Sequence, residues 1–260
     1  MTESELTVID APRGPAAGPG VAARRTPRAA PRSRSGRCFD AAVRAYVDRH
    51  PEATVVALGE GLGTGFWRLD NGRLNWLTVQ PPESAAVRRM LLPDGSRQHT
   101  VARAAADHGW LDAVREPRRG VIVMASGVLM RLPPPAVRAL LAACAERFPG
   151  GALVFDALSR RATALARRGA ALSGGRWPAP VRWGLDRSDL PRVASAHPGI
   201  AGVRELALPA RPVALVDRVP GVRALTPLVC EVRFAARQAE FDDTARAAAD
   251  RARGGWPAPR

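Results

Sequence analysis

The chain contains no lysine, a single tyrosine and three cysteines, and it has no long uninterrupted apolar run. Without about 20 consecutive apolar residues, no segment can cross a membrane as a helix. The cysteines (Cys38, Cys144 and Cys230) are odd in number and far apart, so they form no disulfide framework and are typical of a reducing compartment. The N-terminal segment has proline and arginine where a signal peptide has an apolar core, so the sequence predicts a cytoplasmic protein.

All 39 basic residues are arginines, and with 24 acidic residues they give a formal net charge of +15. This excess is spread along the chain, without a long run of cations, and aromatic residues make up only 5%. Nucleic-acid binding is therefore disfavoured, because it needs clustered cations or aromatic side chains for base stacking. The four histidines lie apart from one another and from the cysteines, so the sequence predicts no metal site.

Composition divides the chain into three parts. Residues 1–36 are rich in alanine, proline and arginine, with almost no large apolar side chain after Ile9, so we expect them to be disordered. Residues 37–235 have the mixed composition of a folded domain. Residues 236–260 are rich in alanine and arginine and are predicted to form a C-terminal tail.

Within the central part, short apolar runs alternate with helical patterns. Thr54–Leu58 is an apolar run closed by glycine, as expected for a strand buried on both faces. Residues 135–147 carry an apolar stripe with helical spacing. Further strands are predicted at 74–79, 98–102, 121–124, 152–155, 203–208 and 229–234. This alternation predicts an α/β fold with a largely parallel sheet covered by helices on both faces.

A glycine-rich turn follows the first predicted strand. Residues 59–65 read GEGLGTG, and glycine lets a backbone turn sharply and approach a ligand closely. After a buried strand and before a helix, such a turn is where an α/β sheet places a nucleotide-like cofactor, although it can also simply join a strand to a helix. About twenty residues on, where a dinucleotide fold has an acid for the ribose hydroxyls, the chain has Gln80, a neutral hydrogen-bonding partner.

Several linked segments then resemble a known family. They are GEGLGTGFWR at 59–68, VQPPE at 79–83, GVLMRL at 127–132, FPGG at 148–151 and FDALS at 155–159, with RCFD at 37–40 and WLD at 110–112. In this order they resemble the leucine carboxyl methyltransferase family and, within it, the bacterial polyketide-type O-methyltransferases. The resemblance covers about residues 37–234. It implies a class I S-adenosylmethionine-dependent methyltransferase fold, Rossmann-like, with a seven-stranded, mostly parallel sheet whose last strand is antiparallel.

The resemblance also implies an activity and a cofactor. It implies transfer of a methyl group from S-adenosylmethionine to a small-molecule carboxylate or hydroxyl acceptor, as in polyketide or other secondary metabolism. The alternative is a catalytically degenerate relative, a partner or scaffold with weak or no cofactor binding. This alternative arises because Gly63 and Gly65 stand where the family usually has aspartate and arginine.

The cofactor-binding positions that we predict combine the glycine turn with the family's motifs. They are Arg37, Gly59, Glu60, Gly61, Gly63, Gln80, Ala104, Ala105 and Ser126. By resemblance, Ala104 stands where an acid holds the adenine amino group, and Ser126 replaces a glutamate. Glu60 either faces the cofactor's ammonium group or is a solvated loop residue. Asp156, at the end of a predicted strand, is the candidate catalytic residue near the acceptor, with a purely structural role as the alternative.

Overall fold

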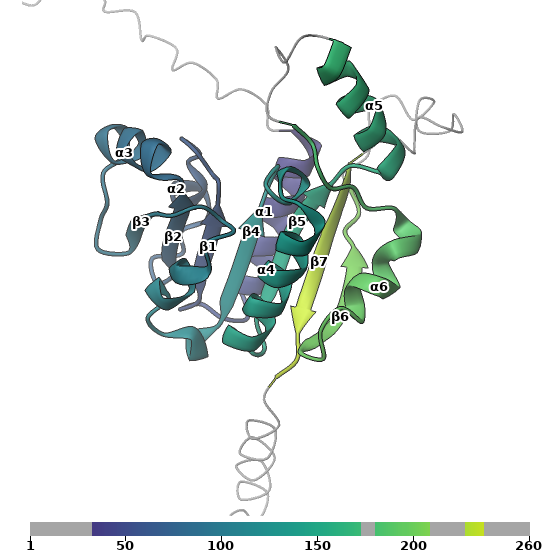
Figure 1. Ribbon diagram of the computed structural model, residues 1–260. Coiled ribbons are helices and arrows are strands. Elements are labelled where there is room, and N and C mark those ends of the chain that lie inside the picture. The colour runs from purple at the N-terminus through teal and green to yellow at the C-terminus, as the bar shows by residue number, and fades with distance from the viewer. Residues whose placement is uncertain (1–32, 173–179, 209–226, 237–260) are drawn as a thin grey trace, which may run out of the picture. The chain divides into compact units, whose positions relative to one another are not determined.

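The computed structural model describes residues 33–172, 180–208 and 227–236. Within these residues, seven strands form one sheet in the order β3-β2-β1-β4-β5-β7-β6 (Figure 1). The strands are β1 (Thr54–Leu58), β2 (Asn75–Gln80), β3 (Gln98–Ala102), β4 (Val121–Ala125), β5 (Ala152–Ala157), β6 (Ile200–Glu205) and β7 (Leu228–Phe234).

Strands β1 to β5 pair in parallel, and β7 pairs antiparallel with both β5 and β6. This arrangement confirms the predicted class I methyltransferase fold, including its antiparallel last strand. β1 and β3 have the predicted bounds, whereas β6 begins at Ile200 rather than at residue 203. As an edge strand, β6 is only partly buried, so its sequence is no continuous apolar run that would mark its position.

Helices connect most of the strands. They are α1 (Arg34–Val47), α2 (Gly65–Leu69), α3 (Pro82–Leu91), α4 (Pro134–Arg147), α5 (Arg160–Leu172) and α6 (Leu190–Ala194), with the 3-10 turns η1 (His108–Ala113), η2 (Pro117–Arg119), η3 (Leu129–Arg131) and η4 (Arg187–Asp189). α1 begins at Arg34, before the domain boundary predicted at Arg37, and the Ser33 hydroxyl caps it by accepting the Gly36 N–H at 3.0 Å. Residues 1–32, the larger part of the predicted disordered segment, and residues 237–260 of the predicted tail lie outside the described residues.

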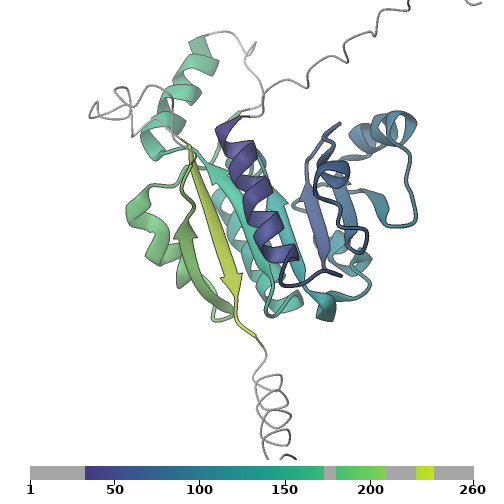
Figure 2. The same ribbon diagram turned by 180° about the vertical axis from the view of Figure 1, so that it is seen from behind.

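The sheet is covered on both faces, by α4 on one and α1 on the other (Figures 1 and 2). Alternate residues of a strand point to opposite faces. Accordingly, Val56 of β1 belongs to the same apolar cluster as Leu140 of α4, while its neighbour Val55 belongs to the cluster of Val43 in α1. This two-sided burial explains why the central strands are continuous apolar runs.

The single tyrosine fixes α1 against the sheet. The hydroxyl of Tyr46 accepts the backbone N–H of Val121, the first residue of β4, at 3.0 Å. The phenol is 3% exposed, and this burial raises the pKa of Tyr46. The contact therefore joins the end of α1 to the start of a central strand.

Two tryptophans pack against the sheet. Trp76 of β2 and Trp110 of η1 are buried, and the Trp110 Nε1–H donates to the carbonyl of Ala105 at 3.2 Å. Trp67, by contrast, is 51% exposed. No helix among the described residues is both long enough and apolar enough to cross a membrane.

Candidate functional site

The carboxyl ends of the central strands bring several predicted residues to one edge of the sheet. Leu58, the last residue of β1, is level with Val79 of β2 and with Ala125 of β4. The following residues, Gly59, Gln80 and Ser126, therefore lie at the same edge. The strand order reverses at β1, because β2 and β3 lie on one side and β4 and β5 on the other. Open α/β sheets bind their ligands at such a reversal.

The glycine turn begins in a conformation that glycine alone adopts easily. Gly59 and Gly61 have φ of +62° and +61°. A Cβ on Gly59 would lie 2.7 Å from the Val128 side chain, so the turn packs closely against the loop after β4. A Cβ on Gly61 would meet nothing within 4 Å. The space beside the Gly61 Cα is therefore open.

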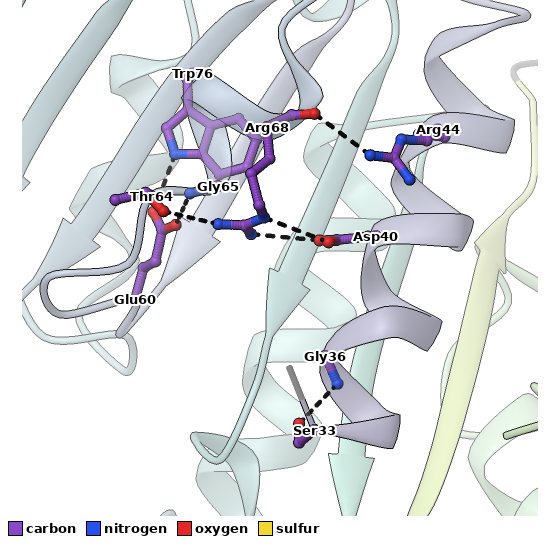
Figure 3. Close-up of polar contacts among 9 residues, drawn as sticks. All are labelled: Ser33, Gly36, Asp40, Arg44, Glu60, Thr64, Gly65, Arg68 and Trp76. Carbon is purple, nitrogen blue, oxygen red and sulfur yellow. Dashed lines mark hydrogen bonds and ion pairs between the residues drawn. The ribbon is translucent and has the colours of Figure 1, made fainter. Parts of the chain in front are cut away.

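The carboxylate of Glu60 points into the turn (Figure 3). Its Oε1 accepts the backbone N–H of Gly65 at 2.8 Å, and its Oε2 accepts the Trp76 Nε1–H at 3.1 Å and the Thr78 hydroxyl at 3.4 Å. The side chain is only 8% exposed. The sequence left open whether the Glu60 carboxylate faces a cofactor or the solvent. In the structure this carboxylate is bound by other groups of the protein.

A buried arginine completes this arrangement. The side chain of Arg88, from α3, is fully buried, and its Nη2 lies 3.6 Å from Glu60 Oε2. Its Nη1 donates to the carbonyls of Gly61 and Gly63 at 2.6 and 2.9 Å. Arg88 is not among the residues predicted from the sequence. Its helical spacing from Ala85, the other buried residue of α3, was the available signal.

The turn's later glycines make room for the neighbouring side chains. A Cβ on Gly63 would lie 2.5 Å from Glu60 Cγ, and a Cβ on Gly65 would lie 2.5 Å from the indole ring of Trp76. At these two positions the resemblance leads us to expect aspartate and arginine. The inward side chains of Glu60 and Trp76 explain why glycine stands there instead.

Arg68 connects the turn to α1 (Figure 3). Its guanidinium donates to the Thr64 hydroxyl at 3.0 Å and to both carboxylate oxygens of Asp40 at 3.4 Å, and its carbonyl accepts from Arg44 at 3.4 Å. Arg37, predicted to bind the cofactor, is an exposed residue of the same helix. The segments RCFD and FWR are therefore joined in space.

Gln80 has a buried acceptor without a partner at the carboxyl edge of the sheet. It is 1% exposed, and its Nε2 donates to the Ser84 carbonyl at 2.9 Å, while no described residue donates to its Oε1. An unpaired buried acceptor is costly, so the site suits a hydroxyl donor. Together with the open Gly61, this fits a cofactor that carries a ribose. Ala104 and Ser126 are exposed loop residues, and neither carries a charge.

Asp156 holds the loop that follows β4. Its Oδ1 accepts the backbone N–H of Gly127, which has a φ of +69°, at 2.5 Å. The residue is 8% exposed, and this burial raises the pKa of Asp156 despite the opposing effects of the Gly127 hydrogen bond and of the Arg131 charge. The geometry shows Asp156 positioning the backbone next to Ser126.

Because of this environment, the contribution of Asp156 to the free energy of unfolding depends on pH. The pKa of Asp156 is higher in the folded protein than in the unfolded chain, so folding favours the neutral carboxyl. The neutral carboxyl therefore contributes to the free energy of unfolding at a pH below the ordinary aspartate pKa. This contribution is lost as the pH rises through the native pKa. We expect Asp156→Asn to remove this decline, since an amide oxygen still accepts from Gly127. Denaturant unfolding of both proteins across this pH range measures the difference. Parallel pH profiles would show that Asp156 contributes nothing to the slope.

Comparison with solved structures supports the fold. The chain is similar to a protein of Thermobifida fusca that is provisionally assigned as a methyltransferase, with a TM-score of 0.59 and 17% identity over 78% of this chain and 81% of the other. It is also similar to a DUF574 family protein of Streptomyces avermitilis, with a TM-score of 0.54 and 10% identity over 77% and 82%. No family model and no curated protein match the sequence. The domain thus has the class I methyltransferase fold.

Proposed function

We propose that this protein is an S-adenosylmethionine-dependent O-methyltransferase that acts on a small organic acceptor. The observation that carries the proposal is the unpartnered Oε1 of buried Gln80, at the end of the strand next to the open turn at Gly61. The resemblance to polyketide-type enzymes supports an acceptor from secondary metabolism. When bound, S-adenosylmethionine would supply a methyl group on a sulfonium that also serves as the leaving group.

The chain's own residues would hold this cofactor mostly through neutral groups. Gly59 and Gly61 would lie against it with bare backbone, and Gln80 would accept from a ribose hydroxyl. Ser126 and the backbone of Ala104 would contribute on the adenine side. Glu60 contributes indirectly, because its contacts with Gly65 and Arg88 fix the shape of the turn.

The site favours a carboxylate acceptor. Methyl transfer depends chiefly on holding the acceptor oxygen in line within a dry pocket. A hydroxyl acceptor also gains from a general base, whereas an ionised carboxylate needs none. Asp156, the candidate that the sequence offered, already accepts from Gly127, so we assign it to positioning the loop rather than to proton transfer.

Replacing Gln80 tests the cofactor site directly. We expect Gln80→Leu to raise the Kd for S-adenosylhomocysteine about tenfold, because it removes the only proposed hydrogen bond to the ribose at this position. Calorimetric titration of both proteins measures this change. Gln98→Leu is the matched control, because Gln98 is equally buried but lies at the amino end of β3. If the two variants bind alike, Gln80 does not contact the ligand.

The second candidate function is a non-catalytic relative that serves as a partner or scaffold. The internal contacts of Glu60 and Arg88 favour it, because they hold the turn in shape without a ligand, while Gly63 and Gly65 bring no charge. Titration of the folded protein separates the two candidates. An absence of heat with millimolar S-adenosylmethionine and S-adenosylhomocysteine would favour the non-catalytic protein.

A further inference from the structure

A hollow lies away from the glycine turn, bounded by α4, α5 and residues 182–196. Its volume is about 480 Å³, within the usual range of small-molecule sites, and no residue of the turn lines it. The backbone N–H groups of Arg182 and Trp183 both donate to the carbonyl of Met130, at 2.7 and 3.1 Å. One wall of the cavity is thereby attached to η3, in the loop after β4.

The inner wall of this cavity is apolar. Val137 and Leu141, on the sheet-facing side of α4, are each 2% exposed. The ring of Trp183 lies 5.7 Å from that of Phe155 in β5, which holds the indole against the sheet. These fixed apolar surfaces suit the hydrocarbon body of a ligand.

The rim carries a surplus of positive charge. Arg138, Arg160, Arg167, Arg182 and Arg192 line the cavity, together with a single carboxylate, that of Asp189. Asp189 lies 2.7 Å from Arg160 and 3.7 Å from Arg192, and the nearby Asp186 lies 4.0 Å from Arg160. The other three arginines form no ion pair with any residue that the structure describes. These three arginines therefore give one side of the cavity an unneutralised positive charge, while the inner wall is apolar.

A buried hydroxyl without a partner lies on the wall. Thr163 of α5 is 7% exposed, and its Oγ1 has no hydrogen-bond partner among the described residues. Gly184 faces it, and a Cβ at that position would overlap the hydroxyl oxygen. An unsatisfied buried hydroxyl is unfavourable. The Thr163 hydroxyl in the cavity wall therefore lacks a hydrogen-bonding partner among the described residues.

We propose that this cavity binds an amphipathic organic anion, a compact aromatic or aliphatic body that carries one acidic group. The body would lie on Val137, Leu141 and Trp183, and the acidic group would face the unpaired guanidinium groups of Arg138 and Arg182. This inference goes beyond the proposed function, because binding here needs no methyl donor.

The probe is 2-naphthoate, compared with its neutral analogue 2-naphthamide. With the full chain and no cofactor, we expect naphthoate to quench Trp183 fluorescence and to bind at one site at least tenfold more tightly than the amide. The difference is expected to shrink as salt is added, because salt screens the exposed arginines. Equal affinity for the two probes, or no binding at millimolar concentration, would overturn the proposal and leave a cavity that holds water only.

Variants then locate the binding site. Ala164→Trp changes an exposed α5 residue on the cavity wall, so it is expected to fill the hollow and abolish binding without destabilising the fold. Arg138→Gln combined with Arg182→Gln is expected to weaken naphthoate binding at least tenfold. The control is Arg118→Gln combined with Arg115→Gln, which removes two exposed arginines elsewhere. Equal losses in the two double variants would show that net charge alone attracts the anion, and the proposal would fail.

Discussion

Arg88→Met is expected to lower the free energy of unfolding by about 3–5 kcal/mol, the usual cost of removing one partner from a buried ion pair. Methionine fills a similar volume but leaves the carboxylate of Glu60 without its counter-ion. It also leaves the carbonyls of Gly61 and Gly63 without the donors that now bind them at 2.6 and 2.9 Å. Denaturant unfolding monitored by tryptophan fluorescence measures the loss.

Two comparisons make this result specific. Arg118→Met removes an exposed arginine from η2 and is expected to change the unfolding free energy by less than about 0.5 kcal/mol. Adding Glu60→Gln to Arg88→Met is expected to restore part of the loss, because no uncompensated charge then remains buried. If Arg88→Met behaves like Arg118→Met, the ion pair does not stabilise the turn.

Gly65→Ala is the second substitution with a large expected effect, a loss of about 1–3 kcal/mol from overpacking. The new methyl group would lie 2.5 Å from the ring of Trp76, which is 1% exposed and has no room to move, and 2.6 Å from Glu60 Oε1. Thermal and denaturant unfolding both report the loss. The result would show that the glycine is required by packing rather than by contact with a ligand.

A matched glycine and a second background test this explanation. Gly95→Ala adds the same methyl group where nothing lies within 4 Å and φ is not positive, so we expect no loss of stability there. Trp76→Phe shortens the ring that the methyl group would strike. In that background Gly65→Ala should cost less, and an undiminished cost would contradict the proposed collision.

The fold could be predicted from the sequence because strands that are buried on both faces have continuous apolar sequences. β1 and β3 were predicted with their observed bounds, and the stripe of α4 was placed within one residue of its start. β6 begins three residues before its predicted start, and its partly exposed length mixes polar with apolar residues. The opposite edge strand, β3, is also partly exposed but keeps its predicted bounds, so position at the edge alone does not decide whether a strand can be located from the sequence.

The site was less accessible to sequence reasoning. The order of motifs identified the turn and Gln80, and the parallel register brings their ends to one edge. The spacing of Arg88 from Ala85 could have indicated that Arg88 is buried, but its partners, backbone carbonyls 25 to 27 residues away, are set only by the fold. The cationic cavity could not be predicted from the sequence either, because α4, α5 and residues 182–196 come together only in the folded domain.

The contact between Tyr46 and Val121 has a practical consequence. Because the chain has a single tyrosine, its ultraviolet difference spectrum on alkaline titration comes from one known phenol at the junction of α1 and β4. The raised pKa of Tyr46 keeps that phenol un-ionised in the folded domain after a free tyrosine would have lost its proton. Formation of tyrosinate thus gives an optical record, without any label, of when the first helix separates from the sheet.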